Sequence, residues 1–113
     1  MKQFLLAAVT GIILLSPARA SYDVAEALQK FDTATPVEKS IIKGLIKANA
    51  DGFAIANWDL KQNGKPPLYC EPVKITLTAE QLIDILRQWA KAHPSNFPTV
   101  MALLFALKEA FPC

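Results

Sequence analysis

Residues 78–91 read Thr-Ala-Glu-Gln-Leu-Ile-Asp-Ile-Leu-Arg-Gln-Trp-Ala-Lys, and this stretch decides the fold class. Thr78 followed three residues later by Gln81 is a capping box, a signature of a helix N-terminus. The apolar residues that follow recur at helical spacing on one side, and charged or amide residues occupy the other side. His93-Pro94 ends the pattern, because proline cannot continue a helix. The stretch predicts an amphipathic helix that packs its apolar side against other helices.

A second helix is predicted downstream, over residues 98–111. Between residues 100 and 107 it has no polar side chain, and Lys108 and Glu109 are its only charges. A helix that is apolar all round must be covered on every side. In a domain of this size it is either the central helix of a bundle or a helix shared with a second copy of the chain. The sequence leaves both alternatives open.

Upstream, one long helix is predicted over residues 36–62. Thr35 is a typical capping residue, Pro36 suits the first helical position, and Asn63-Gly64 is a stop signal. Small side chains recur every fourth residue along this helix, and such a strip lets another helix approach closely. The strip consists of Gly44, Ala48, Gly52 and Ala56.

The same long helix has two sides when its residues are spaced at 100°. Apolar residues gather on one half, namely Val37, Ile41, Leu45, Ala48, Ile55 and Ala56. Lysines gather on the opposite half, namely Lys39, Lys43, Lys47 and Lys61. A lysine stripe of this kind is commonly a solubilising surface, and the alternative is a contact surface for an acidic partner.

The rest of the chain adds one short helix and one irregular segment. The short helix is predicted over residues 22–31, and a polar break follows it at 33–35. Segment 63–77 cannot be helical around Pro66-Pro67. Apolar and polar residues alternate near its end, which allows a short extended stretch, although the sequence shows no partner strand for it. The chain of 113 residues is therefore predicted to form one all-α bundle of about four helices.

The first 20 residues form a separate unit. Residues 1–3 carry one positive charge, residues 4–15 carry none, and Ala18-Arg19-Ala20 places small residues two apart. This layout is typical of a secretory signal peptide, and the apolar stretch is too short to cross a bilayer, which requires about 20 residues. We expect cleavage after Ala20, which leaves residues 21–113 as a single exported domain without a membrane anchor.

Export changes how the charges and the cysteines are interpreted. The whole chain has 12 basic and 10 acidic side chains, and Lys2 and Arg19 of the signal peptide account for the net charge of +2. The neutral remainder lacks the dense basic patch that nucleic acid binding requires. In an oxidising compartment the only two cysteines, Cys70 and Cys113, can pair. We predict this disulfide, which would join the irregular segment to the end of the last helix.

The sequence offers few residues for catalysis. His93 is the only histidine, and its position at a helix C-terminus before a proline predicts a structural cap. Glu80 and Asp84 lie one helical turn apart on the polar side of their helix, which predicts a solvated charged surface rather than an acid–base pair. Metal-ligand spacings, phosphate-binding loops and nucleophile motifs are absent. We therefore expect no enzyme activity, no metal and no cofactor.

The residues most suited to binding a partner follow the long helix. Residues 63–69 read Asn-Gly-Lys-Pro-Pro-Leu-Tyr, and the two prolines lower the entropy cost of presenting Leu68 and Tyr69. In the alternative, Leu68 and Tyr69 pack down on the bundle, and the sequence leaves both readings open. The candidate partner-binding residues are Asn63, Lys65, Pro66, Pro67, Leu68 and Tyr69, together with Lys43 and Lys47.

Several segments resemble the Rap/Tai immunity proteins. They are Cys70-Glu71-Pro72, Leu-Thr-Ala-Glu-Gln-Leu at 77–82, His93-Pro94, and Ala-Leu-Lys-Glu-Ala-Phe-Pro-Cys at 106–113. The similarity covers about residues 40–113 in matched order and spacing, and the terminal Ala-Phe-Pro-Cys is its most specific part. The sequence departs from the family pattern at Trp89-Ala90 and at Ser95.

The resemblance implies a function as well as a fold. It implies a small periplasmic homodimer that neutralises a peptidoglycan amidase effector of a type VI secretion system by occluding its active-site groove. It also implies binding rather than catalysis. Two other functions stay open, a small periplasmic chaperone or stress-response protein and an inhibitor of the cell's own wall hydrolases. The identity of the partner separates the three.

Overall fold

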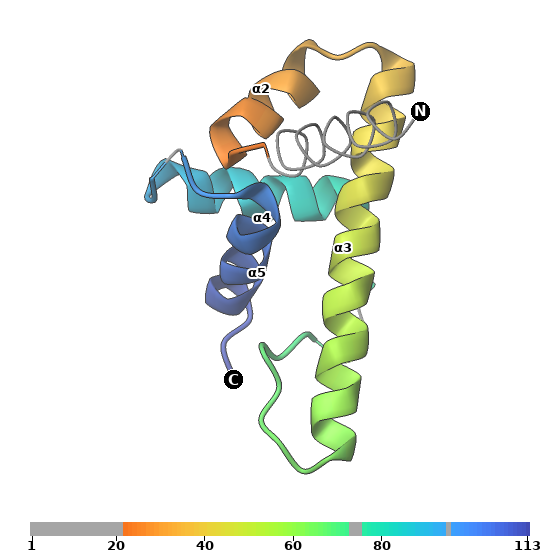
Figure 1. Cartoon of the computed structure of the whole chain (residues 1–113), viewed down its shortest axis with the longest axis vertical. Coiled ribbons are helices and arrows are strands. Elements are labelled where there is room, and N and C mark those ends of the chain that lie inside the picture. The colour runs from red at the N-terminus through yellow and green to blue at the C-terminus, as the bar shows by residue number, and fades with distance from the viewer. Residues whose placement is uncertain (1–21, 73–75, 95) are drawn as a thin grey trace, which may run out of the picture.

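The computed structural model describes residues 22–72, 76–94 and 96–113, which form four α-helices and no strand (Figure 1). The helices are α2 (Val24–Thr33), α3 (Pro36–Gln62), α4 (Ala79–Lys91) and α5 (Thr99–Ala110). The predicted all-α class is confirmed, and the bounds of α3 agree with the predicted helix 36–62. The predicted signal peptide and residues 73–75 of the possible extended stretch lie outside the described residues. In the part of the chain described, each helix is too short or too polar to cross a membrane.

Local capping sets where α3 and α4 begin. The Thr35 hydroxyl accepts a hydrogen bond of 3.3 Å from the backbone N–H of Glu38. At the start of α4, the Thr78 hydroxyl accepts from the Gln81 backbone N–H at 3.2 Å, and the Gln81 side chain accepts from the Thr78 N–H at 2.9 Å. The predicted capping box is therefore present, and both helices begin where short-range chemistry places them.

The start of α5 has no side-chain cap of its own. The backbone N–H and the hydroxyl of Thr99 both donate to the carbonyl oxygen of Tyr22, at 3.1 and 2.6 Å. The Val24 N–H in turn donates to the Phe97 carbonyl oxygen at 2.8 Å. These bonds join the start of α2 to the start of α5 across more than seventy residues of sequence, so tertiary contacts replace the missing cap.

Helix α5 contacts all three other helices, as α4 does, and it packs most extensively against α4. Its buried residues are Ala102, Leu103, Ala106 and Leu107. Within the single chain these four residues face the other helices, and both alternatives for this apolar helix stay open. Val100 and Met101 in its first turn remain about half exposed, at 47% and 49%.

The other helices cover a different side of α3 from the apolar half that the sequence predicts. Ile46, Ala50 and Asn57 point into the bundle and are buried, whereas Val37 and Ile55 are exposed at 71% and 68%. This helix carries apolar residues on two sides, so the periodicity alone could not show which side the other helices would cover. The packing of α4 and α5 against α3 determines which side is buried.

The predicted close approach of another helix to the small-residue strip of α3 is wrong within this chain. A Cβ atom added at Gly44 or at Gly52 would meet no heavy atom within 4 Å. The strip lies on the exposed side of α3, next to Val37 and Ile55. No described helix of the same chain covers it.

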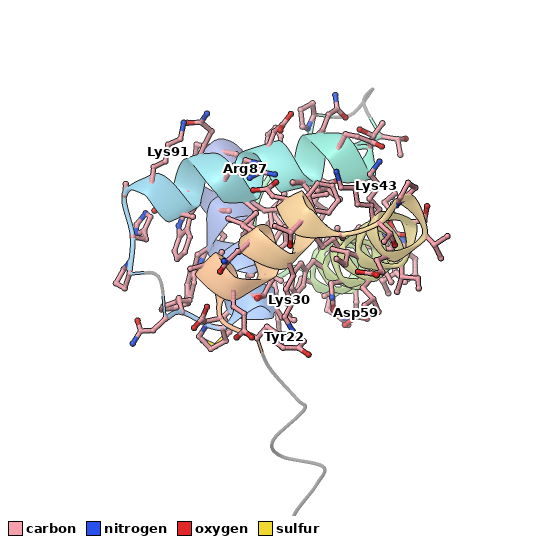
Figure 2. The ribbon with its side chains drawn as sticks, turned by 90° about the horizontal axis from the view of Figure 1, so that it is seen from above. Tyr22, Lys30, Lys43, Asp59, Arg87 and Lys91 are labelled. Carbon is pink, nitrogen blue, oxygen red and sulfur yellow. A yellow bond between two sulfur atoms is a disulfide. The ribbon has the colours of Figure 1, made fainter. Side chains whose placement is uncertain are left out.

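Figure 1 shows α3 running along the length of the molecule with α4 lying across it. Ion pairs at the surface join α4 to α2 and to α3, and Figure 2 labels the two basic residues concerned, Arg87 and Lys43. Arg87 of α4 makes a two-pronged pair with Asp32 of α2, with an Nη1–Oδ2 distance of 2.9 Å. Lys43 of α3 contacts Glu80 at the start of α4, with an Nζ–Oε1 distance of 2.8 Å.

Candidate functional site

Residues 63–72, here called the clamped loop, return from the end of α3 toward the end of α5 (Figure 1). The loop begins at Gly64, whose φ of +68° lies in the left-handed region that glycine adopts without strain. The Lys65 N–H then donates to the Leu60 carbonyl oxygen at 2.8 Å, which closes the last turn of α3. The loop therefore leaves the helix in one defined direction.

Asn57 holds the middle of the clamped loop through both ends of its side-chain amide. Its Oδ1 accepts from the Leu68 N–H at 2.7 Å, and its Nδ2 donates to the Tyr69 carbonyl oxygen at 3.2 Å. Asn57 is 7% exposed, so these bonds lie away from competing water. Asn57 is not among the residues predicted above to form the site. The available signal was an asparagine in a helix interior, where its propensity is low, aligned with the buried Ile46 and Ala50.

The far end of the clamped loop is joined to α5. Cys70 and Cys113 form the predicted disulfide, with a Cα–Cα distance of 5.0 Å. The Cys70 N–H also donates to the Phe111 carbonyl oxygen at 2.9 Å. A covalent bond and a backbone hydrogen bond thus attach the loop to the end of the chain, and the predicted pairing of the two cysteines is confirmed.

Tyr69 lies in the core rather than on the surface of the clamped loop. It is 1% exposed, so the alternative in which it packs down on the bundle describes the structure. Burial raises the pKa of its hydroxyl above the usual value, and the negative charge of Glu71 raises that pKa further. The hydroxyl has no hydrogen-bond partner among the described residues. Tyr69 therefore anchors the loop from beneath and remains neutral at physiological pH.

The outer edge of the clamped loop is the part that another protein can reach. Asn63, Lys65 and Pro66 are exposed, and Pro67 and Leu68 are half-buried. The two prolines fix their own φ angles, and the attachments at Asn57 and Cys70 hold the backbone on either side. The structure thus combines a rigid base with an accessible edge that carries an amide, an ammonium group and an apolar ring.

The other two candidate residues, Lys43 and Lys47, lie along α3 and away from this edge. Each already has an acidic partner, Glu80 for Lys43 and Asp51 for Lys47, the latter at 2.6 Å. The Lys43 ammonium holds the pKa of the Glu80 carboxyl below its usual range. Both lysines are partly exposed, so they remain accessible, but their charges are largely balanced within the chain.

The residues considered for catalysis serve the fold. The His93 ring stacks on Trp89 with centroids 4.1 Å apart, and its Nε2 lies 3.1 Å from a carboxylate oxygen of Glu109 on α5. Glu80 is paired with Lys43 rather than with Asp84. Among the residues that the structure describes, no group of three or more histidine, cysteine or acidic side chains has the geometry to hold a metal ion.

Comparison with known proteins gives the functional context of this geometry. A family model described as Rap1a immunity proteins matches residues 18–113. The chain belongs to the Rap1a immunity protein family. No curated protein and no solved structure matches it in the other two comparisons. As an immunity protein the chain protects against a secreted effector.

Proposed function

We propose that this Rap1a-family protein acts in the periplasm, after removal of residues 1–20, against a peptidoglycan amidase delivered by a type VI secretion system. Family membership supports a secreted effector as the target. The Cys70–Cys113 disulfide supports an oxidising compartment, because disulfides persist there and are rare in the cytosol. The chain inhibits by occluding the active-site groove of the amidase, and performs no catalysis and needs no cofactor.

The observation that carries this proposal is the clamped loop, which is rigid at its base and exposed at its edge. A loop already held in one conformation loses little entropy on binding, so more of its contact energy appears as affinity. We propose that Asn63, Lys65 and Pro66 enter the groove and that Pro67 and Leu68 pack behind them. Tyr69 supports the loop from within the core. Because Tyr69 is buried, we propose that it acts through the loop and makes no direct contact with the amidase.

Two further contacts complete the proposal. Lys43 and Lys47 form a secondary surface for acidic residues of the amidase, with smaller effect because each is already paired within the chain. The protein works as a homodimer, and neither nucleic acid nor membrane is a partner after export. Mass spectrometry of the protein recovered from the periplasm should show a chain that begins at Ser21.

The test uses the amidase encoded beside this chain and a peptidoglycan hydrolysis assay. The unaltered protein should bind this amidase and abolish hydrolysis. Lys65→Glu reverses the charge at the exposed edge of the clamped loop and should weaken inhibition at least about tenfold, which corresponds to about 1.4 kcal/mol of binding free energy. Lys91→Glu is the matched control, because it reverses an exposed lysine at the far end of α4 and should leave inhibition unchanged.

The possible results separate the candidate functions. Equal inhibition by both variants would mean that the clamped loop is not the inhibitory contact, while immunity itself would stand. Weak binding to many unfolded proteins and no amidase inhibition would indicate a periplasmic chaperone or stress-response protein. Inhibition of the cell's own wall hydrolases, and not of the neighbouring amidase, would indicate a housekeeping inhibitor.

A further inference from the structure

A groove lies between α4 and α5, the two helices that pack most extensively against each other (Figure 1). Its volume of about 420 Å³ is at the low end of the range for ligand sites, so it suits a small group rather than a large ligand. Here it is called the acidic groove. The residues of its lining that matter below are Asp84, Gln88 and Trp89 of α4 and Ala106, Glu109 and Ala110 of α5.

The acidic groove has an apolar floor and a charged rim. Ile85, Ala106 and Ala110 supply apolar surface, and Ala106 is fully buried beneath it. Asp84 and Glu109 are exposed and place one carboxylate on each of the two helices. A long basic side chain has the same division, because its stem is apolar and its head is charged. The lining therefore matches the side chain of an arginine or a lysine.

The two carboxylates of the rim are not neutralised by basic residues of the same chain. Arg87, one helical turn from Asp84, makes its two-pronged pair with Asp32 instead. Among the described residues, the ion-pair partner of Glu109 is His93 at 3.1 Å, which carries a charge only when protonated. A carboxylate has about four lone-pair sites, so Glu109 can accept further hydrogen bonds. The rim thus keeps negative charge for a cation from outside.

Trp89 adds a polar group that lacks a partner. It is 6% exposed, and its indole Nε1 has no hydrogen-bond acceptor among the described residues. A buried donor without an acceptor costs free energy, and a ligand that brings a carbonyl oxygen to it recovers part of that cost. An aromatic ring in the lining also attracts a cation. Both properties favour a basic residue within a peptide over a free metal ion.

From these observations we infer that the acidic groove binds one arginine side chain of a partner protein. The guanidinium lies between Asp84 and Glu109, and the stem lies on Ile85 and Ala106. Arginine fits better than lysine, because its planar head has five N–H donors and can bond to carboxylates on two sides while it stacks on an aromatic ring. The smaller ammonium of lysine has three donors and binds as a point charge.

The position of the acidic groove indicates which partner brings the arginine. Ala110 directly precedes Phe111, whose carbonyl oxygen accepts a hydrogen bond of 2.9 Å from the N–H of Cys70 in the clamped loop. The groove therefore lies beside the point where the clamped loop is attached to α5. We assign the arginine to the amidase that contacts this loop, and this assignment rests on the proposed function.

The first experiment tests the site without the amidase. The probe is the tripeptide Ala-Arg-Ala with both ends blocked, titrated into the purified protein and followed by nitrogen–proton correlation NMR. The Trp89 indole signal should shift and saturate, with a dissociation constant on the order of 1–10 mM. The signal of Trp58, which lies on α3 and is 64% exposed, is an internal reference and should not move. The same peptide with citrulline, the neutral isostere of arginine, should leave both signals in place.

Two variants test the residues of the site. Asp84→Asn removes one exposed carboxylate of the rim and should weaken binding of the arginine peptide about fivefold. Glu38→Gln is the matched control, because it removes one negative charge from an exposed residue of α3 and should leave binding unchanged. Ala110→Leu fills the groove from an exposed position and should abolish binding, whereas Ala25→Leu adds the same bulk on α2 and should not.

Three results would overturn the site: no shift of the Trp89 signal, equal shifts with arginine and citrulline, or equal binding by Asp84→Asn and Glu38→Gln. The amidase assay then tests the partner. Asp84→Asn should weaken inhibition about fivefold relative to Glu38→Gln, and equal inhibition by the two would overturn the assignment to the amidase. An unaltered protein that binds the arginine peptide and inhibits no amidase would overturn the proposed function and leave the arginine site in place.

Discussion

Asn57 lies on the packed side of α3 near the end of the helix, and both ends of its side-chain amide bond to the clamped loop. It is the one buried polar side chain among the residues that the structure describes. Such a residue costs stability unless its donors and acceptors are satisfied, and here two backbone groups of the loop satisfy them. A helix residue thereby fixes the conformation of a segment more than ten positions further along the chain.

Replacing Asn57 should loosen the loop and destabilise the protein. Asn57→Ala leaves the Leu68 N–H and the Tyr69 carbonyl oxygen without partners, and we expect a loss of about 1–3 kcal/mol in the free energy of unfolding. Urea unfolding measures this loss, and hydrogen exchange should show faster exchange at the Leu68 amide. Asn49→Ala is the matched control, because the Asn49 side chain bonds only to the Leu45 carbonyl oxygen of its own helix and should cost far less. Equal losses in the two variants would contradict this account.

The Lys43–Glu80 pair makes a separate prediction about pH. Lys43 lowers the pKa of Glu80 in the folded protein. The pair therefore stabilises the fold at pH values above the usual carboxyl pKa, and this contribution is lost as the pH falls through the lowered pKa. In Lys43→Met the pKa of Glu80, followed by NMR titration, should return toward its usual value of 4.5. Lys47→Met removes a neighbouring lysine that pairs with Asp51 and should leave the Glu80 titration unchanged. An unchanged Glu80 pKa in Lys43→Met would refute the assignment.

At the scale of elements, the clamped loop behaves as a covalent extension of the bundle. Its start continues α3, its middle is held by Asn57, and its end is bonded to the terminus of α5. A ten-residue segment with neither helix nor strand is ordinarily the most mobile part of a small domain. Here three attachments at short intervals replace the hydrogen bonds that regular secondary structure would provide.

Removing the disulfide should cost much of the stability of this domain. Cys70 and Cys113 are 43 positions apart, and chain entropy predicts a contribution of up to about 4 kcal/mol for a closed loop of this size. We expect the double variant Cys70→Ser/Cys113→Ser to lose about 2–4 kcal/mol in urea unfolding. The reduced unaltered protein should show the same loss, which controls for the serine side chains. A loss below about 1 kcal/mol in both would mean that the hydrogen bonds alone hold the loop.

At the scale of the whole molecule, both ends of the described chain lie next to α5. Tyr22 is bonded to its first residue, Thr99, and Cys113 follows directly after its last turn. Its buried residues Ala102, Leu103, Ala106 and Leu107 pack against the other three helices, while Val100 and Met101 remain about half exposed. The same packing buries one side of α3 and leaves Val37, Ile41 and Ile55 exposed on the opposite side.

Much of this architecture could be predicted because it depends on short-range chemistry. The bounds of α3 and the capping box of α4 follow from residues three or four positions apart, whose hydrogen bonds form in any helix that starts there. The disulfide followed from there being two cysteines and a predicted export signal. Even the candidate loop could be located, because prolines and Asn63-Gly64 exclude helix whatever surrounds them.

The sequence by itself thus determined which segments are helices, where α3 and α4 begin, and which cysteines pair. Only the tertiary structure decided which apolar side of α3 is buried, that Tyr69 lies in the core, and that Asn57 holds the clamped loop. The physical reason is that burial is a property of all the helices together. A helix with two apolar sides, or an aromatic residue beside a proline turn, can satisfy the local rules in either orientation, and the packing of the other helices against it decides which side is buried.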